Sequence, residues 1–378
     1  MPAPAIYLDY PATTPCDPQV VEAMLPFFSG LVGNPHNRQH AAGRAAAAAI
    51  EAARAEIAAL IGARPGEIIF TSGATEANNL ALQGMARARR DRGRHLVTVA
   101  TEHASVLEPL HALARDGFAL TVLPVDAGGL VDPERVALAL RPDTILVSVM
   151  AVNNEIGTIQ PLAEIGALCR ARGIPFHSDA AQAAGRLSLD VGALPVDLLS
   201  LSAHKIYGPA GIGALYLRSG DLLPLQQGGG QERGLRPGTL PTALCVGFGR
   251  AAALAAAARA SEQARLEILT DRLWQGLRRQ LPDIRRHGDP RHGVTGLLSI
   301  GFPGLDASLL MEDLPDLALS SGAACNAASG RPSSVLAAIG LDAAAAQGTL
   351  RIGLGRFTLE ADIDRAIALI GDAAGHQT

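Results

Sequence analysis

The middle of the chain alternates between short apolar runs and stretches with helical periodicity. The apolar runs are rich in β-branched residues, which is typical of buried strands, and they span 95–100, 118–125, 144–152, 174–180, 197–203 and 211–217. Between two of these runs, the segment 161–173 places its apolar residues on one helical face and ends at Gly173. This alternation predicts an α/β domain with a largely parallel sheet.

Two alanine-rich tracts, at 41–62 and from Arg250 to about Arg278, are expected to be helices. The second is long enough to carry the chain out of the α/β domain into a smaller C-terminal one. We therefore expect a large domain over 15–255 and a small domain formed by 1–14 and 256–378. A chain of 378 residues, 48% of them hydrophobic, is long enough to bury two cores.

The charge balance argues against a polyanionic partner. The net charge is -4 and the pI is about 6.2, so we expect no general attraction to nucleic acid or to an anionic membrane surface. The arginine-rich stretch 87–94 is interpreted as a solvated helix end rather than as a phosphate-binding patch. No apolar run approaches the roughly 18 residues that span a membrane. The first residues lack the pattern of a signal peptide, so we expect a cytoplasmic protein.

The four cysteines are Cys16, Cys169, Cys245 and Cys325. None lies at metal-ligand spacing from another, so we expect neither a metal site nor a disulfide framework. Cys169, on an apolar helical face, and Cys245 are expected to be buried. Cys325 lies in the segment SSGAACNAASGRPSS, which shows no apolar periodicity. There we favour a mobile nucleophile over a buried side chain.

Polar residues follow the strands at their carboxyl ends, where open α/β sheets bind their ligands. Ala74 and Thr75 open a helix after the strand at 67–73. Their free backbone N–H groups suit a phosphate, although an ordinary helix N-cap gives the same pattern. His103 follows the next strand and suits stacking on a flat cofactor or proton transfer, whereas a lone histidine in such a place is more often structural.

Two further strand ends carry an acid and a lysine. Asp179 suits an ion pair with a pyridinium nitrogen, or a helix N-cap. Lys205, beside His204, lies between a buried strand and a Gly-Pro turn, which is an unusual place for a solvated charge and suits a Schiff base. Together these residues supply a phosphate cup, a ring stacker, a pyridinium partner and a Schiff-base lysine, the contacts that pyridoxal phosphate needs.

A series of longer stretches matches one known family in order and over nearly the whole chain. These stretches are YLDYPATTP (7–15), GNP (33–35), FTSGATEANNLAL (70–82), TEHASVL (101–107), VNNEIGTIQ (152–160), HSDAAQAAG (177–185), SAHKIYGPAGIGALY (202–216), GGGQERGLRPGTLP (228–241), SSGAAC (320–325) and LRIGLGRFT (350–358). The sequence resembles the cysteine desulfurases (NifS/IscS-like) of the class V aminotransferase family, which are fold-type I pyridoxal-phosphate enzymes. The resemblance implies a large domain with a mostly parallel central sheet flanked by helices, and a smaller α+β C-terminal domain.

The same resemblance implies how the cofactor ring is held. Lys205 would bind pyridoxal 5′-phosphate covalently, and Asp179 would pair with its pyridine nitrogen. His103 would stack on the ring and serve as an acid or base. Asn154 and Gln182 would form hydrogen bonds near the ring hydroxyl.

The resemblance also implies how the phosphate is held. Ala74, Thr75, Ser202 and His204 would bind it within one chain. Thr239 would reach the phosphate of the neighbouring subunit, which implies a homodimer. Gln231 stands where many relatives carry a histidine, so the details of this loop are open.

The substrate and the sulfur path follow from the same family. Arg351, with Asn154, would bind the carboxylate of L-cysteine through the paired donors of its guanidinium. Cys325 would take the substrate sulfur as a persulfide, release L-alanine, and pass the sulfur to an acceptor such as an iron–sulfur scaffold or a thiolation protein. A selenocysteine lyase, an aminotransferase of the same fold, and a catalytically silent sulfur-binding protein are the alternatives. The intact set of site residues argues against the last of these.

Overall fold

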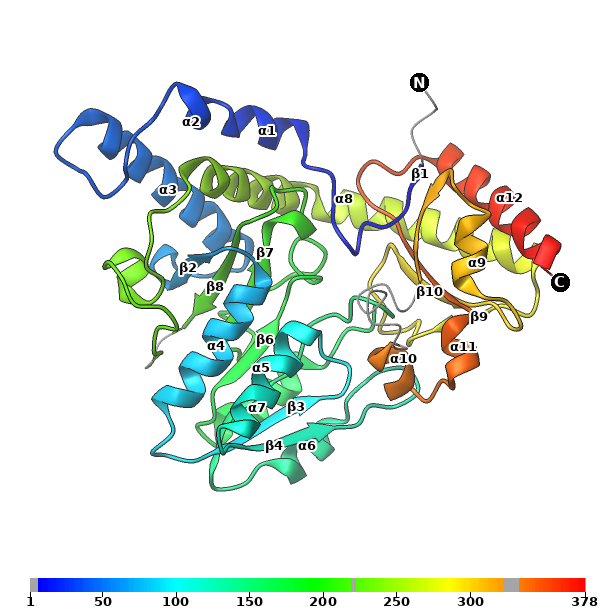
Figure 1. Ribbon diagram of the computed structural model, residues 1–378, viewed down its shortest axis with the longest axis horizontal. Coiled ribbons are helices and arrows are strands. Elements are labelled where there is room, and N and C mark those ends of the chain that lie inside the picture. Colours follow the sequence, from blue (N-terminus) through cyan, green and yellow to red (C-terminus); the bar gives the residue numbers. More distant parts are fainter. Residues whose placement is uncertain (1–5, 219, 221, 322–332, 378) are drawn as a thin grey trace.

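A seven-stranded sheet forms the centre of the larger part of the molecule (Figure 1). The computed structural model describes residues 6–218, 220, 222–321 and 333–377. The strands, in spatial order, are β2 (Ile68–Thr71), β8 (Gly213–Leu217), β7 (Leu198–Ser202), β6 (Phe176–Asp179), β5 (Thr144–Ser148), β3 (His95–Val99) and β4 (Ala119–Leu123). Within this sheet β8 alone runs antiparallel to its neighbours, so the predicted α/β class with a mostly parallel sheet is confirmed.

Helices cover both faces of the sheet. Successive residues of a strand point to opposite faces, and most strand residues of this sheet are apolar, so both faces have to be buried. In β2, Ile69 packs in one core cluster and Phe70 in the other. The first cluster is covered by α4 (Ala74–Ala88) and α5 (Ala104–Arg115). The second is covered by α1 (Pro18–Met24), α3 (Ala41–Leu60), α6 (Pro133–Ala139), α7 (Leu162–Ala171) and α8 (Thr242–Gln280). The short helix α2 (Pro26–Ser29) follows α1.

The alanine-rich tracts form α3 and α8, which pack closely together. A Cβ on Gly249 of α8 would lie 2.5 Å from Cα of Ala53 on α3, so only small residues permit this approach. Helix α8 is 39 residues long and begins eight positions before the predicted start at Arg250. By length and composition it could cross a membrane, which corrects the expectation that no segment reaches that size. Its buried residues nevertheless belong to the two cores, as in the core helix of a globular domain.

A smaller four-stranded antiparallel sheet lies at the far end of α8 (Figure 1). Its strands, in spatial order, are β12 (Ser320–Ser321), β13 (Thr349–Gly353), β10 (Leu297–Gly301) and β9 (Arg285–His287). Beside it, β1 (Ile6–Tyr7) pairs with β11 (Leu317–Ala318). The helices of this part are α9 (Ala307–Glu312), α10 (Ser334–Ala338), α11 (Ala343–Gln347) and α12 (Glu360–Gln377). Along α8 the large core extends to Ala255 and the small core begins at Leu266, while the domain boundaries stay a prediction.

A buried ion pair fixes the surface loop that precedes α8. The guanidinium of Arg54 donates to both carboxylate oxygens of Glu232, each at 2.8 Å, and both residues are 8% exposed. Glu232 lies in the 3-10 helix η3 (Gln231–Gly234) with a φ of 46°. Its carboxylate also accepts the backbone N–H of Phe70 at 2.6 Å. The ion pair therefore holds a strained turn against α3 and β2.

We expect Glu232→Ala to lower the free energy of unfolding by about 3–5 kcal/mol, because it leaves the Arg54 charge buried without its partner. Urea unfolding followed by circular dichroism measures the loss. The matched control is Glu360→Ala, which removes an exposed partner of Arg272 and is expected to cost at most about 1 kcal/mol. Equal losses in the two variants would contradict this assignment.

Candidate active site

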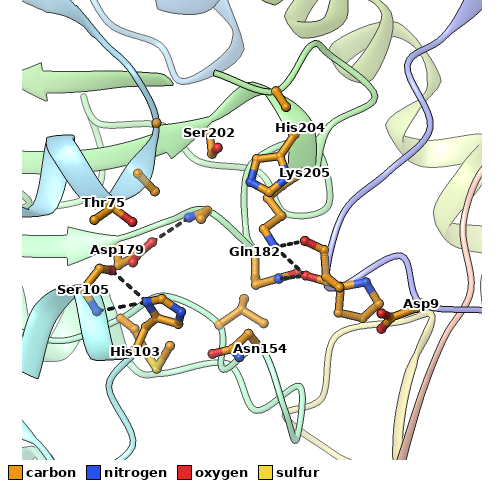
Figure 2. Close-up of a pocket in the computed structure, with 18 of the residues that line it drawn as sticks. Asp9, Thr75, His103, Ser105, Asn154, Asp179, Gln182, Ser202, His204 and Lys205 are labelled. Carbon is orange, nitrogen blue, oxygen red and sulfur yellow. Dashed lines mark hydrogen bonds between the residues drawn. The ribbon is translucent and has the colours of Figure 1, made fainter. Parts of the chain in front are cut away.

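The carboxyl ends of β2, β3, β5, β6 and β7 meet at one edge of the large sheet, where they border a cavity of about 600 Å³ (Figure 2). Arg351 reaches the same cavity from β13 of the four-stranded sheet. The predicted site residues that line it are Ala74, Thr75, His103, Asn154, Asp179, Gln182, Ser202, His204, Lys205 and Arg351. The strand-end rule therefore located the cavity correctly.

Lys205 lies in a turn that the N-terminal segment holds from the side. The turn is the 3-10 helix η2 (Ala203–Lys205), directly after β7. The Nζ of Lys205 donates to the carbonyl oxygens of Pro11 and Ala12, each at 2.6 Å (Figure 2). Next to it, Nδ1 of His204 lies 3.0 Å from Oγ1 of Thr13. Burial, with the Lys205 charge adding to it, lowers the pKa of His204 to about 4, so this histidine is neutral at pH 7.

The corner between β2, β7 and α4 suits an anion. Helix α4 begins at Ala74 and points its first N–H groups toward the cavity that Ala74 and Thr75 line. The Ser202 hydroxyl, at the end of β7, is buried and has no hydrogen-bond partner among the described residues. A Cβ on Gly213 would lie 2.7 Å from Cα of Gly73, so this glycine lets the turn lie close against the sheet.

Asp179 and His103 lie close to each other on one side of the cavity (Figure 2). Asp179, 6% exposed at the end of β6, accepts the backbone N–H of Ala181 at 2.9 Å. His103 is the N-cap residue of α5 and accepts the backbone N–H of Ser105 at Nδ1. Burial lowers the pKa of His103; the Asp179 charge opposes this shift and the Lys205 charge adds to it. Asp179 thus presents a buried carboxyl group and His103 a neutral imidazole.

Arg351 is 4% exposed and is held on several sides. Its Nη2 donates to Asp9 Oδ1 at 2.9 Å and to the Ser320 hydroxyl at 3.2 Å. Its Nη1 donates to the Asn154 carbonyl oxygen at 3.1 Å. Its Nε is buried and has no partner among the residues that the structure describes. A carboxylate entering the cavity would find a fixed guanidinium with donor capacity left.

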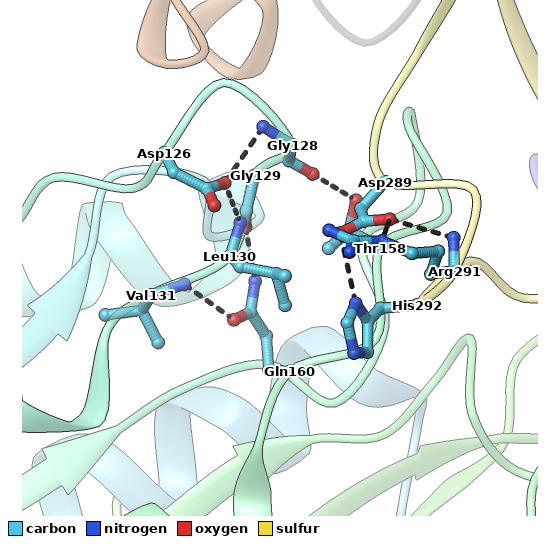
Figure 3. A network of polar contacts seen from close by, with 10 residues as sticks. All are labelled: Asp126, Gly128, Gly129, Leu130, Val131, Thr158, Gln160, Asp289, Arg291 and His292. Carbon is cyan, nitrogen blue, oxygen red and sulfur yellow. Dashed lines mark hydrogen bonds and ion pairs between the residues drawn. The ribbon is translucent and has the colours of Figure 1, made fainter.

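Polar contacts hold Thr158 and Gln160, which follow the loop that carries Asn154 in the sequence (Figure 3). Gln160 Nε2 donates to the Gly129 carbonyl oxygen at 2.6 Å. The N–H of Ile159 donates to the carbonyl oxygen of His292 at 2.7 Å. Asp289 in turn accepts from His292 Nδ1 at 3.0 Å. Ile159 and Gln160 are therefore held by two separate segments, through Gly129 and through His292.

The sequence interpretation missed residues that support this site. Asp9 and Ser320 hold Arg351, while Asn78 and Ser105 lie behind Asp179 and His103. Each of the four occurs in a stretch that was recognised as a motif, yet none stands directly after a strand of the large sheet. Their partners come from distant segments, so spacing alone did not identify them.

One predicted site residue that the structure describes, Thr239, does not line the cavity. Thr239 is exposed on the segment between η3 and α8, so its predicted contact with the phosphate of a neighbouring subunit stays a prediction. In the same loop, Gln231 accepts the backbone N–H of Gly238 at 3.0 Å. Cys325 lies outside the described residues. The prediction that Cys169 and Cys245 are buried is confirmed, since both are 0% exposed.

Comparison with known proteins identifies the family. The profile of the aminotransferase class-V family matches residues 6–366, so the chain belongs to this family. Among curated relatives, a cysteine desulfurase of Homo sapiens is 49% identical over 365 residues, which cover 96% of this chain and 80% of the relative. A cysteine desulfurase IscS of Rickettsia rickettsii is 47% identical over 368 residues, covering 97% and 90%.

Solved structures give the same result. A NifS-like protein superposes with a TM-score of 0.92 at 35% identity, covering 98% of this chain and 100% of that one. A structure of SspA in complex with cysteine superposes with a TM-score of 0.83 at 39% identity, covering 94% and 100%. The fold is that of the fold-type I pyridoxal-phosphate enzymes, and pyridoxal 5′-phosphate is the cofactor of the family.

The residues present fit this cofactor. The corner at the start of α4, with the Ser202 hydroxyl that has no partner among the described residues, suits its phosphate, and the buried Asp179 carboxyl group suits its ring nitrogen. Gln182 is fixed through Nε2 to the Pro11 carbonyl oxygen at 2.7 Å. Its Oε1 is buried and has no partner among the described residues, so it can accept a hydrogen bond from a ligand. Lys205 lies between these groups with its amine directed into the cavity.

We expect Cys325 to be the fast-reacting thiol of the native protein. Burial raises the pKa of Cys169 and of Cys245 to about 12, so neither forms a thiolate at pH 8, and burial also raises the pKa of Cys16. Titration with Ellman's reagent at pH 8 should show a fast phase that is absent in Cys325→Ala and retained in Cys16→Ala. A fast phase that persists in Cys325→Ala would contradict the assignment.

Proposed function

We propose that this protein is a pyridoxal-phosphate-dependent cysteine desulfurase, which converts L-cysteine to L-alanine and takes the sulfur onto Cys325 as a persulfide. One observation carries the proposal. Lys205, Asp179 and Arg351, from three distant segments, line a single cavity in a chain whose relatives at 47% to 51% identity are cysteine desulfurases.

The proposed roles of the chain's residues follow from their places around the cavity. When bound, pyridoxal phosphate supplies a ring that stabilises negative charge at the substrate Cα. Asp179 would hold a proton on the ring nitrogen, and Nζ of Lys205 would bind the cofactor and, once the substrate amine has displaced it, would accept the Cα proton. The carbonyl oxygens of Pro11 and Ala12 orient this amine, because both accept hydrogen bonds from it.

Substrate selection rests on Arg351. Its guanidinium binds the α-carboxylate of the substrate, while hydrogen bonds to Asp9 and Ser320 fix the position of the guanidinium. Asn154 supports it through its carbonyl oxygen. Arg351 is almost fully buried, so its charge favours binding of an amino acid, which carries a carboxylate, over binding of an amine that has none.

Sulfur transfer follows from the chemistry of two thiols. The thiolate of Cys325 attacks the substrate sulfur, a sulfur–sulfur bond forms, and the bond between the sulfur and Cβ breaks. The electron pair of the broken bond stays on Cβ, which takes a proton to become the methyl group of alanine. The sulfur is thus oxidised and Cβ reduced, and no external oxidant is needed. The persulfide then passes to an acceptor protein of iron–sulfur cluster assembly or of another sulfur pathway.

We also propose a homodimer in which Thr239 reaches the partner's phosphate site. Thr239 is exposed and outside the cavity of its own chain, which leaves it available to a second copy. An exposed apolar surface on and beside α1 and α2 is consistent with such an interface. It consists of Val21, Leu25, Phe28, Leu31 and Val32.

The remaining alternatives concern substrate and compartment. A selenocysteine lyase shares the cofactor, but the two curated relatives described above are cysteine desulfurases by name, so this alternative is not favoured. A cytoplasmic location stays a prediction, because the relatives include proteins named mitochondrial as well as a bacterial one.

We expect Lys205→Ala to abolish covalent binding of the cofactor and to lower activity by at least about 10³-fold, since both the bond and the proton acceptor are lost. Borohydride reduction followed by mass spectrometry should find the cofactor on a peptide of the wild type that contains Lys205, and on no peptide of the variant. If Lys205→Ala kept the visible absorption of the covalently bound cofactor, the assignment of Lys205 would be wrong.

We expect Cys325→Ala to bind the cofactor normally yet to release almost no sulfide from L-cysteine in the presence of a reductant. Wild type should give equal amounts of sulfide and alanine. The matched control is Cys16→Ala, because Cys16 is a half-buried thiol outside the cavity. This variant should keep full activity. Unchanged activity of Cys325→Ala would leave the cofactor assignment intact and remove the persulfide step.

A further inference from the structure

A chain of hydrogen bonds joins Asp179 to His103 through two side chains that the proposed mechanism does not use. Asn78 Nδ2 lies 2.7 Å from Asp179 Oδ2 and 2.8 Å from the Ser105 hydroxyl oxygen. The Ser105 hydroxyl lies 2.8 Å from His103 Nδ1. Asn78 is 0% exposed and Ser105 9% exposed, so water does not compete for these bonds. Figure 2 shows the contact between Ser105 and His103.

The carboxylate of Asp179 determines how the Asn78 amide is oriented. An amide nitrogen carries two hydrogens, and here both are used, one toward Asp179 and one toward Ser105. The reverse orientation would place Oδ1 of Asn78 against the carboxylate, acceptor against acceptor. Asn78 is therefore a donor to both neighbours.

The orientation of Asn78 in turn determines that of Ser105. Because the Ser105 oxygen accepts from Asn78, its own hydrogen is available for His103 Nδ1. The backbone N–H of Ser105 donates to the same ring nitrogen at 3.1 Å. Two donors converge on Nδ1, so this nitrogen is unprotonated and the hydrogen of the neutral ring lies on Nε2.

We propose that Asn78 and Ser105 are positioning residues that hold His103 as the Nε2–H tautomer, so that the ring presents a hydrogen-bond donor to the cavity. The burial that lowers the pKa of His103 acts in the same direction, since it keeps the ring neutral. A proton could enter the ring at Nδ1 only if both donors of Ser105 moved away. The identity of the groups that Nε2–H meets rests on the proposed function, whereas the tautomer does not.

NMR of the holoenzyme labelled with ¹⁵N-histidine tests the tautomer directly. The His103 signals are assigned by their absence in His103→Gln. We expect one ring nitrogen of the pyridine type at Nδ1 and one of the pyrrole type at Nε2 at pH 8. A Nδ1–H tautomer, or a cationic ring at this pH, would overturn the proposal.

Two substitutions of Ser105 separate positioning from general stability. Ser105→Ala removes the hydroxyl donor and is expected to lower kcat about tenfold with little change in KM, and to raise the fraction of the other tautomer. Ser105→Thr keeps a hydroxyl and should restore both kcat and the NMR signature. If Ser105→Ala leaves the tautomer and kcat as in the wild type, the Ser105 hydroxyl does not position His103, and the proposed chain from Asn78 to His103 is wrong.

Asn78→Asp tests the first link of the chain. It replaces a donor by an acceptor beside Asp179, so the two carboxyl groups share a proton and the visible absorption of the bound cofactor should shift. Asn79→Asp adds the same charge one residue along α4, where the side chain instead bonds to the Thr75 carbonyl oxygen, and should leave the absorption unchanged. An equal shift in both variants would overturn the role of Asn78. Absence of sulfide release from cysteine with the tautomer intact would instead contradict the proposed function.

Discussion

The site depends on how the N-terminal segment 9–14 holds the amine of Lys205. The carbonyl oxygens of Pro11 and Ala12 both accept hydrogen bonds from this amine. The segment also accepts a hydrogen bond from Gln182 and, through Asp9, pairs with Arg351. A single stretch of backbone thus sets the positions of groups that come from the seven-stranded sheet and from the four-stranded sheet. Because backbone carbonyl groups in an ordered segment cannot rotate freely, they give a more fixed geometry than side chains would.

Close packing around this segment explains why it is ordered. A Cβ on Gly353 of β13 would lie 1.9 Å from Cδ of Pro11, so the approach requires glycine at this position. The N–H of Gly353 donates to the Leu8 carbonyl oxygen at 2.7 Å. On the other side, the Thr14 hydroxyl donates to the carbonyl oxygen of His204 at 2.9 Å. The segment is therefore bonded to the strand that carries Arg351 and to the turn that carries Lys205.

A second contact between the lysine turn and the segment after β13 is made by Tyr207, two residues after Lys205. Tyr207 has a φ of 66°, a conformation that side chains rarely adopt, and its ring lies 4.2 Å from the guanidinium carbon of Arg356. Its hydroxyl accepts the backbone N–H of Arg356 at 2.7 Å, while Arg356 also pairs with Asp17 and Glu262. The strain at Tyr207 is offset by these contacts, which tie the lysine turn to the segment after β13.

Sequence alone gave the elements of the large sheet and most of the cavity, because both depend on local rules. Short apolar runs mark strands, and ligand-binding residues follow them, which placed His103 and Lys205 correctly around one cavity. Asp9 was missed because its partner Arg351 is 342 positions away in the chain, and only the folded structure brings them together. Asn78 was missed because a polar residue inside a helix usually faces solvent, whereas this one is buried between two site residues.

The buried polar atoms left over in the cavity connect binding with stability. Among the described residues, Ser202 Oγ, Gln182 Oε1 and Arg351 Nε are buried without hydrogen-bond partners. Each such atom costs about 1–3 kcal/mol when it stays unsatisfied. A cofactor phosphate, a ring hydroxyl and a substrate carboxylate are the groups proposed to meet these three atoms. Since a ligand that satisfies them binds the folded chain and not the unfolded one, it stabilises the fold by the same contacts that orient it for reaction.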